Sequence, residues 1–187
     1  MSDALKILAI SGSLRAGSLN TRLLEAAVEL VPSGMTVELY EGLGEIPHYN
    51  ADLDGAATPP AVVDLRSRIA RADGVLIATP EYNYSIPGVL KNAIDWASRP
   101  SATSALRRKP VAAMGAAPGN FGTVRAQLAL RQMWVWIDAM PVVKPEVHVF
   151  RAAERFDASG RLTDVATREL IVELLEALRS KIEHQAV

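Results

Sequence analysis

The sequence predicts an α/β protein in which a doubly wound parallel sheet has helices on both faces, and three observations predict it. Short apolar segments alternate with longer segments whose apolar residues recur at helical spacing. The short segments are almost unbroken runs, as at residues 7–10, which is typical of strands buried on both faces. The 187 residues are 49% hydrophobic and 22% charged, as in an ordinary globular protein. Residues 1–187 are therefore expected to form one domain.

The second of the first two strand–helix pairs contains a long loop between its strand and its helix. The apolar run at 5–11 predicts a strand, and the helix behind it stops where Pro32 and Gly34 interrupt the helical spacing. A second strand is expected at 35–40. A segment rich in Gly, Pro, Asn and Asp then leads to a helix at 61–72. Irregular segments of this length are usually functional or mobile.

Three further pairs complete the expected fold. Strands are expected at 74–79, 109–114 and 141–150, and helices from near Pro87, at 122–139 and at 162–183. The alternation implies right-handed crossovers between parallel strands. With five strands, the order 2-1-3-4-5 is favoured over a six-strand dinucleotide-binding order. Ligands of such sheets lie at the carboxyl ends of the strands, here between the first and third.

Composition excludes several classes of function. The net charge of −1 gives no general attraction to nucleic acid or to an anionic membrane. The absence of cysteine excludes disulfides, thiolate nucleophiles and iron–sulfur clusters, and the three histidines lack the spacing of a metal site. We expect no secretory signal, because the N-terminus is acidic and the first apolar stretch is broken by Lys6. We expect no membrane span, because no apolar run reaches about 18 residues. A cytoplasmic protein without a metal centre is expected.

The loop after the first expected strand carries the donors of a phosphate site. It reads S-G-S-L-R-A-G-S-L-N-T from Ser11 to Thr21, with hydroxyls, an amide, one arginine and two glycines ahead of a helix. Such a loop at a helix N-terminus can bind a phosphate group. It lacks both the Gly-Lys-Ser/Thr ending of an NTPase loop and the G-x-G-x-x-G of dinucleotide folds. The alternative is that Ser18 or Asn20 only caps the helix.

Two other loops are expected beside it. The segment Pro80–Gly88 contains two prolines, two tyrosines and an asparagine, which suit a flat heteroaromatic ring, unless the tyrosines merely fill the core rim. The segment Gly115–Gly122 follows the fourth strand and contains glycines that permit close backbone approach. The basic run Arg107–Lys109 is either a contact for the 2′-phosphate of NADPH or a solvated loop end.

The first loop together with the run P-E-Y-N-Y-S-I-P-G-V-L-K-N-A-I-D-W, residues 80–96, resembles the NADPH-dependent FMN reductase family. That family contains flavodoxin-like quinone, azo and chromate reductases. The resemblance extends over nearly the whole chain. It implies a flavodoxin-like fold with bound FMN, NADPH or NADH as co-substrate, a small-molecule electron acceptor, and a homodimer or homotetramer.

The resemblance also implies which residues bind the cofactor. The phosphate cradle would consist of Ser11, Ser13, Arg15, Ser18, Leu19 and Asn20. The ring and ribityl chain would lie along Pro80, Glu81, Tyr82 and Asn83. Ala117 would add a backbone contact, since family members often carry hydroxyl residues where this chain has Ala116 and Ala117. No catalytic side chain is expected, because the flavin supplies the chemistry.

Two other functions are weighed against the reductase. A flavodoxin-type carrier exchanges single electrons with protein partners and is usually strongly acidic, whereas this chain is almost neutral. A flavin-free nucleotide sensor would be colourless. The helix at 122–139 carries apolar residues around much of its circumference, which indicates either contact with a second subunit or deeper burial in its own domain.

Overall fold

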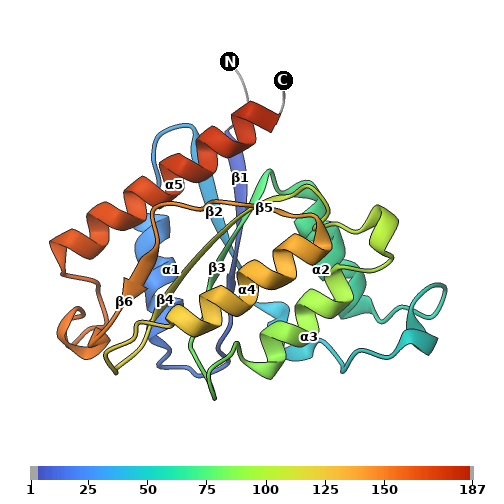
Figure 1. Cartoon of the computed structure of the whole chain (residues 1–187), viewed down its shortest axis with the longest axis horizontal. Coiled ribbons are helices and arrows are strands. Elements are labelled where there is room, and N and C mark those ends of the chain that lie inside the picture. Colours follow the sequence, from blue (N-terminus) through green and yellow to red (C-terminus); the bar gives the residue numbers. More distant parts are fainter. Residues whose placement is uncertain (1–3, 186–187) are drawn as a thin grey trace.

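The computed structural model describes residues 4–185 and contains a parallel sheet between two layers of helices (Figure 1). The strands are β1 (Leu5–Ser11), β2 (Met35–Tyr40), β3 (Gly74–Ala78), β4 (Pro110–Ala116), β5 (Met140–Pro141) and β6 (Val147–Val149). The helices are α1 (Leu19–Glu29), α2 (Pro60–Arg71), α3 (Gly88–Ala97), α4 (Val124–Ile137) and α5 (Val165–Gln185). The sheet order is β2-β1-β3-β4-β5, which confirms the predicted doubly wound topology.

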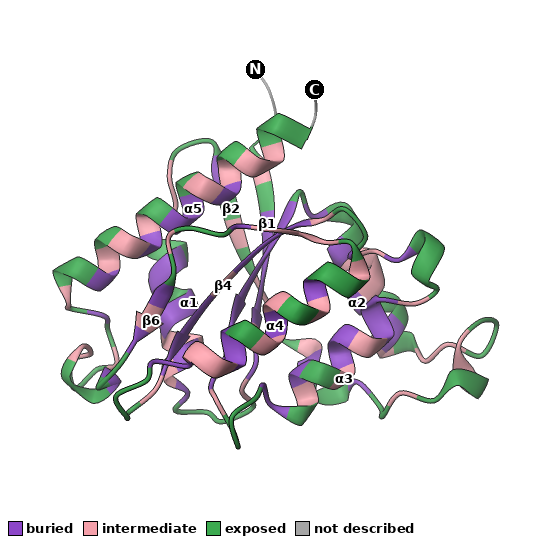
Figure 2. Cartoon of the chain, in the orientation of Figure 1, coloured by how far each residue is buried: buried purple, intermediate pink, exposed green. Residues whose placement is uncertain are grey.

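The sheet separates two hydrophobic cores. One core packs α1 and α5 against the sheet, and the other packs α2, α3 and α4 against the opposite face. Every residue of β3 is buried, as expected for a central strand covered on both sides. Figure 2 shows the same division, with the strands mainly buried and the outer faces of the helices exposed. No helix within residues 4–185 is long and apolar enough to cross a membrane.

The expected fifth strand at 141–150 is wrong as a single strand. It is broken into β5 and β6, which both pair with β4, so the sheet has six strands in five positions. The Val142 N–H still donates to the Val111 carbonyl of β4 at 2.8 Å, and residues 143–146 then leave the ladder. Pro141 and Pro145 have no N–H to donate to a neighbouring strand, and this favours the interruption. The carboxyl end of β6 still reaches the level of the end of β4, because Val149 pairs with Ala116.

Candidate functional site

The candidate site is the edge of the sheet where β1, β3, β4 and β6 end. Backbone hydrogen bonds join these ends directly. The Gly12 N–H donates to the Ala78 carbonyl at 2.8 Å, and the Thr79 N–H donates to the Met114 carbonyl at 3.1 Å. The loops predicted to bind the ligand therefore start from adjacent points of one rigid sheet.

The first loop leaves several backbone donors free at the N-terminus of α1. Ser18 caps the helix, since its Oγ accepts from the N–H groups of Asn20 (3.2 Å) and Thr21 (3.3 Å). The first turn of α1 contains no acidic side chain. Among residues 4–185, no acceptor is found for the N–H groups of Leu14, Ala16, Gly17 and Leu19. Unpaired N–H groups and the positive end of the helix dipole together favour an anion.

The side chains of this loop also favour an anion at the start of α1. Arg15 is exposed, and its guanidinium forms no ion pair with any described residue. The Arg15 N–H donates to the Ser13 Oγ at 3.3 Å, which keeps the loop compact. The Ser11 Oγ is hydrogen bonded to the Thr21 Oγ1 at 2.8 Å, so it supports the loop as well. The loop fits a phosphate monoester, because charge-assisted and backbone donors remain for its oxygens.

Asn20 has a different position from the other predicted phosphate ligands. Its side chain is buried, donates to the Ala116 carbonyl at 3.0 Å and accepts from the Ala116 N–H at 2.9 Å. These two bonds tie the start of α1 to the end of β4. The neighbouring Ala117 donates its N–H to Val149 at 3.0 Å, so that N–H is already used within the protein.

The second loop forms a two-residue hairpin. Tyr82 and Ser85 exchange backbone hydrogen bonds of 2.9 and 3.0 Å. Between them, Asn83 and Tyr84 both have positive φ, 51° and 67°, which is the pattern of a type I′ turn. Pro80 is buried before the hairpin, whereas Tyr82 and Tyr84 are 47% and 73% exposed. The hairpin therefore presents two aromatic rings and an amide at the candidate site.

Glu81 attaches this hairpin to α4. One carboxylate oxygen accepts from the N–H groups of Arg125 (2.9 Å) and Ala126 (3.2 Å), and the other pairs with the Arg125 guanidinium. The hydrogen bond to Glu81 raises the pKa of Arg125 above its ordinary value. The residue before α4, Thr123, makes no side-chain capping bond, so Glu81 caps the helix from a distant loop. The Glu81 carboxylate, predicted from the sequence to lie along the ligand, thus joins the second loop to α4.

Sequence reasoning did not assign a role to Arg125 or Phe121. The Arg125 guanidinium lies 3.9 Å from the centroid of the Tyr84 ring and 4.4 Å from that of Phe121. Such cation–π contacts join the second and third loops. The available signal was the acid Glu81 after one strand and the arginine Arg125 after the next, whose ends a parallel sheet brings together.

The basic run lies at the opposite edge of the sheet from the candidate site. Arg107, Arg108 and Lys109 directly precede β4 and are therefore at the amino end of that strand. The Lys109 Nζ donates to the carbonyls of Ala70 (3.4 Å) and Ala72 at the end of α2, and burial lowers the pKa of Lys109. Arg107 pairs with Asp138 at 3.3 Å. Arg107 and Arg108 are exposed, as in a solvated loop end, whereas Lys109 is partly buried and caps α2.

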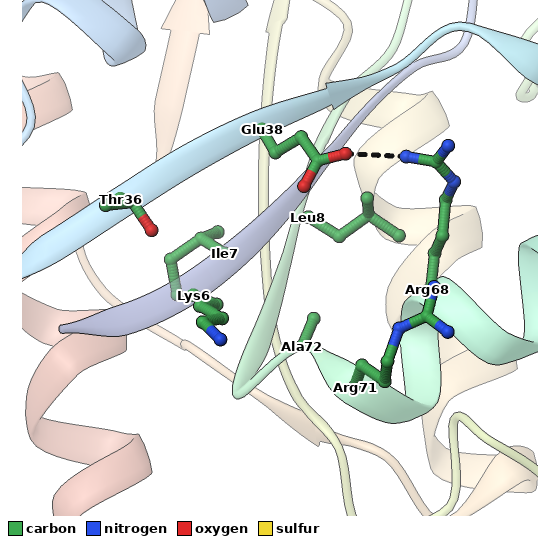
Figure 3. A pocket seen from close by; sticks show the side chains of 8 residues that line it. All are labelled: Lys6, Ile7, Leu8, Thr36, Glu38, Arg68, Arg71 and Ala72. Atoms are coloured by element: carbon green, nitrogen blue, oxygen red, sulfur yellow. Dashed lines mark hydrogen bonds and ion pairs between the residues drawn. The ribbon is translucent and has the colours of Figure 1, made fainter. Parts of the chain in front are cut away.

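A separate pocket of about 340 Å³ lies between β1, β2 and α2 (Figure 3). Its lining residues are Lys6, Ile7, Leu8, Thr36, Glu38, Arg68, Arg71 and Ala72. Figure 3 shows Arg68 paired with Glu38, and Arg68 also binds Asp64 at 3.0 Å. The pocket lies away from the three loops, and two of its four charged residues, Glu38 and Arg68, pair with each other. Within residues 4–185, no cluster of three potential metal ligands is found.

Comparison with known proteins agrees with this geometry. The family model described as NADPH-dependent FMN reductase matches residues 5–154. The chain is 54% identical over 179 residues to the NAD(P)H-dependent FMN reductase of Pseudomonas aeruginosa, covering 96% of each chain. It is 43% identical over 182 residues to the NAD(P)H:quinone oxidoreductase of Solanum tuberosum, covering 94% of this chain and 92% of that one.

A solved structure extends the similarity to the fold. FerB, a flavoenzyme NAD(P)H:(acceptor) oxidoreductase from Paracoccus denitrificans, has a TM-score of 0.87 and 36% sequence identity. The alignment covers 97% of this chain and 98% of FerB. Since the family model spans most of the sequence and relatives match at high identity over almost their full length, the chain belongs to the NADPH-dependent FMN reductase family.

Proposed function

We propose that this protein is an FMN-containing oxidoreductase that uses NADPH or NADH to reduce quinones or other small acceptors. The other acceptors include azo dyes, chromate, ferric chelates and free flavin. The observation that supports it most is the set of unpaired N–H groups at the start of α1, beside Arg15 and at the same edge of the sheet as the exposed Tyr82–Ser85 hairpin. We place the activity in one domain of residues 1–187 and in the cytoplasm, where reduced nicotinamides are available.

The residues of the chain bind and orient the cofactor. Arg15, Ser13 and the N–H of Leu19 would hold the phosphate of FMN, with Ser18 keeping the helix start open to it. Tyr82 and Asn83 would lie along the ring and ribityl chain. The chemistry that FMN supplies when bound is hydride acceptance from a nicotinamide and electron delivery to an acceptor. Asn20 and Glu81 would act mainly by keeping the loops in place.

The Arg15→Ala variant is expected to bind FMN about 10- to 100-fold more weakly, because a charge-assisted hydrogen bond contributes about 1.5–3 kcal/mol. Riboflavin has no phosphate, so its affinity should stay unchanged. Fluorescence titration of the apoprotein with both flavins measures the two values. Arg22→Ala, which removes an arginine of α1 paired with Glu25 at 3.0 Å, is the matched control. An equal loss for riboflavin, or no loss for FMN, contradicts the phosphate assignment.

The reductase differs from a flavodoxin-type carrier in its reaction with nicotinamide. Anaerobic addition of NADPH or NADH should bleach the visible flavin absorption rapidly, whereas a pure carrier would stay yellow.

Steady-state rates at several quinone concentrations should give parallel double-reciprocal lines, because nicotinamide and acceptor use the same face in turn. Intersecting lines argue against that shared face. The near-neutral charge and the names of the relatives favour the reductase.

We further propose that two copies associate through a groove between α3 and α4, as a homodimer or within a homotetramer. The groove has a volume of about 650 Å³ and begins at Ser85 and Ile86, directly beside the hairpin. Trp136, 86% exposed, lies on its rim, and Val135 next to it is 80% exposed. Large exposed apolar groups of this kind mark interaction surfaces. A second copy would cover them and extend the wall of the flavin site.

The Trp136→Glu variant is expected to lower the molar mass measured by light scattering at micromolar concentration to that of a smaller species. A charge buried without a partner at such a surface is strongly unfavourable. Val165→Glu changes an exposed apolar residue of α5, 66% exposed, and should leave the mass unchanged. A monomeric mass for the unchanged protein, or an unchanged mass for Trp136→Glu, contradicts the proposed interface.

A further inference from the structure

The turn at the tip of the Tyr82–Ser85 hairpin is strained at one residue. A type I′ turn requires positive φ at both central positions. Asn83 adopts this conformation readily, because asparagine is tolerated in the left-handed region. Tyr84, with φ of 67°, is a bulky residue for which the conformation is unfavourable. Some other contact must therefore hold Tyr84 in place, and strain of this kind is often found at functional sites.

Burial does not provide that contact. Tyr84 is 73% exposed, so little apolar surface is removed from water. The backbone bonds between Tyr82 and Ser85 close the turn on one side. On the other side, the Arg125 guanidinium lies 3.9 Å from the Tyr84 ring centroid and 4.4 Å from that of Phe121. The position of Tyr84 thus depends on an arginine of α4.

Arg125 is itself firmly oriented. Its guanidinium and its backbone N–H both bind the Glu81 carboxylate, which is only 9% exposed. Glu81 directly precedes the hairpin. The residue before the hairpin therefore holds Arg125, and Arg125 in turn contacts Tyr84 at the tip of the hairpin. A guanidinium can pair in its plane and stack on both faces at once, which lysine cannot do.

We propose that Arg125 is a positioning residue that holds the strained Tyr82–Ser85 hairpin in the conformation required beside the flavin ring. The inference rests on the proposed function for its role in flavin binding, but the contacts exist without the flavin. Through the hairpin, Arg125 determines where Tyr82 and Asn83 lie. Its loss releases the strain at Tyr84, and the turn then leaves the I′ conformation.

The first test needs no flavin. In Arg125→Ala, the amide hydrogens of Tyr82 and Ser85, which bond across the hairpin, should exchange about tenfold faster in the full-length apoprotein. Adding Tyr84→Asn should restore the slow exchange, because asparagine adopts positive φ at little cost. Arg68→Ala is the matched control, since Arg68 also pairs with acids and lies 5.9 Å from the Tyr40 ring, on α2.

The second test measures the ring contact. Arg125→Ala should weaken the binding of FMN and of riboflavin by the same factor, about tenfold, and Tyr84→Asn should restore both. This pattern differs from that of Arg15→Ala, which spares riboflavin. Arg125→Lys keeps the charge and should give an intermediate loss, and it replaces Arg125→Ala if that variant does not fold.

The outcomes separate the two proposals. If the double variant exchanges as fast as Arg125→Ala, Arg125 does not act through strain at Tyr84 and the inference is wrong. Unchanged exchange in both Arg125→Ala and Arg125→Lys also overturns it. If the unchanged protein binds neither flavin, the proposed function fails, while exchange rescued by Tyr84→Asn would still support the Arg125 contact.

Discussion

Replacing Gly115 with alanine is expected to destabilise the protein by about 3 kcal/mol or more, at or above the upper end of the usual cost of overpacking. Gly115 is buried near the end of β4, where the third loop begins. A Cβ added there would lie 2.0 Å from the Thr123 Oγ1 and 2.5 Å from the Thr79 carbonyl oxygen. The clashing Thr79 oxygen belongs to the backbone at the end of the sheet, and Thr123 is 1% exposed. Neither group can therefore move without disturbing the loops. Urea unfolding of the purified variant measures the loss.

Gly119→Ala is the control for this prediction. Gly119 belongs to the same loop, but a Cβ at that position meets nothing within 4 Å. Its unfolding free energy should change by less than about 0.5 kcal/mol, as for most surface substitutions. Equal stability of Gly115→Ala and Gly119→Ala would show that the third loop is not packed as described.

The Asn20→Leu variant is expected to lose about 2–5 kcal/mol of unfolding free energy. Leucine has a similar size but cannot bond the Ala116 N–H and carbonyl, which then remain buried without partners. Flavin affinity should fall in the fraction that stays folded, because the start of α1 is no longer tied to β4. Chemical denaturation and FMN titration of one preparation provide both values.

Asn50→Ala is the corresponding control at an exposed asparagine. The Asn50 Oδ1 accepts from the Asp52 N–H at 3.0 Å and caps only a short turn. A loss of about 1 kcal/mol or less is expected, with unchanged flavin affinity. If Asn20→Leu loses no more stability than Asn50→Ala, the side chain of Asn20 does not connect the two elements. If FMN affinity nevertheless falls, a direct contact with the phosphate becomes the better interpretation.

Both predictions concern buried residues, Gly115 and Asn20, that hold the loops of the site in place and do not face the flavin. The flavin-facing groups proposed here are mostly exposed, whereas Gly115, Asn20 and Thr123 are buried where the strands end. Preorganised loops of this kind bind a rigid ligand without first being ordered, which favours affinity. Substitutions at exposed donors are thus expected to change binding alone, and those at the buried residues to change both binding and stability.

The sequence by itself determined the layers of the fold. The predicted strands 5–11 and 35–40 have the bounds of β1 and β2. The centre of β1 is an apolar run because it is buried on both faces, whereas β2 is an edge strand in which exposed Thr36 and Glu38 alternate with less exposed residues. It also indicated the three loops, since hydroxyl, glycine and aromatic residues follow the strands at which a parallel sheet binds ligands. Local residue type was sufficient for these inferences.

Only the tertiary structure decided what individual polar side chains do. Asn20 bonds to Ala116, 96 residues away, and Glu81 to Arg125, 44 residues away, although both resemble ligand donors in the sequence. The same holds for the division of the last strand and for the basic run at the far edge of the sheet. A side chain bonds to whichever partner the fold brings within about 3 Å, and sequence spacing does not contain that distance.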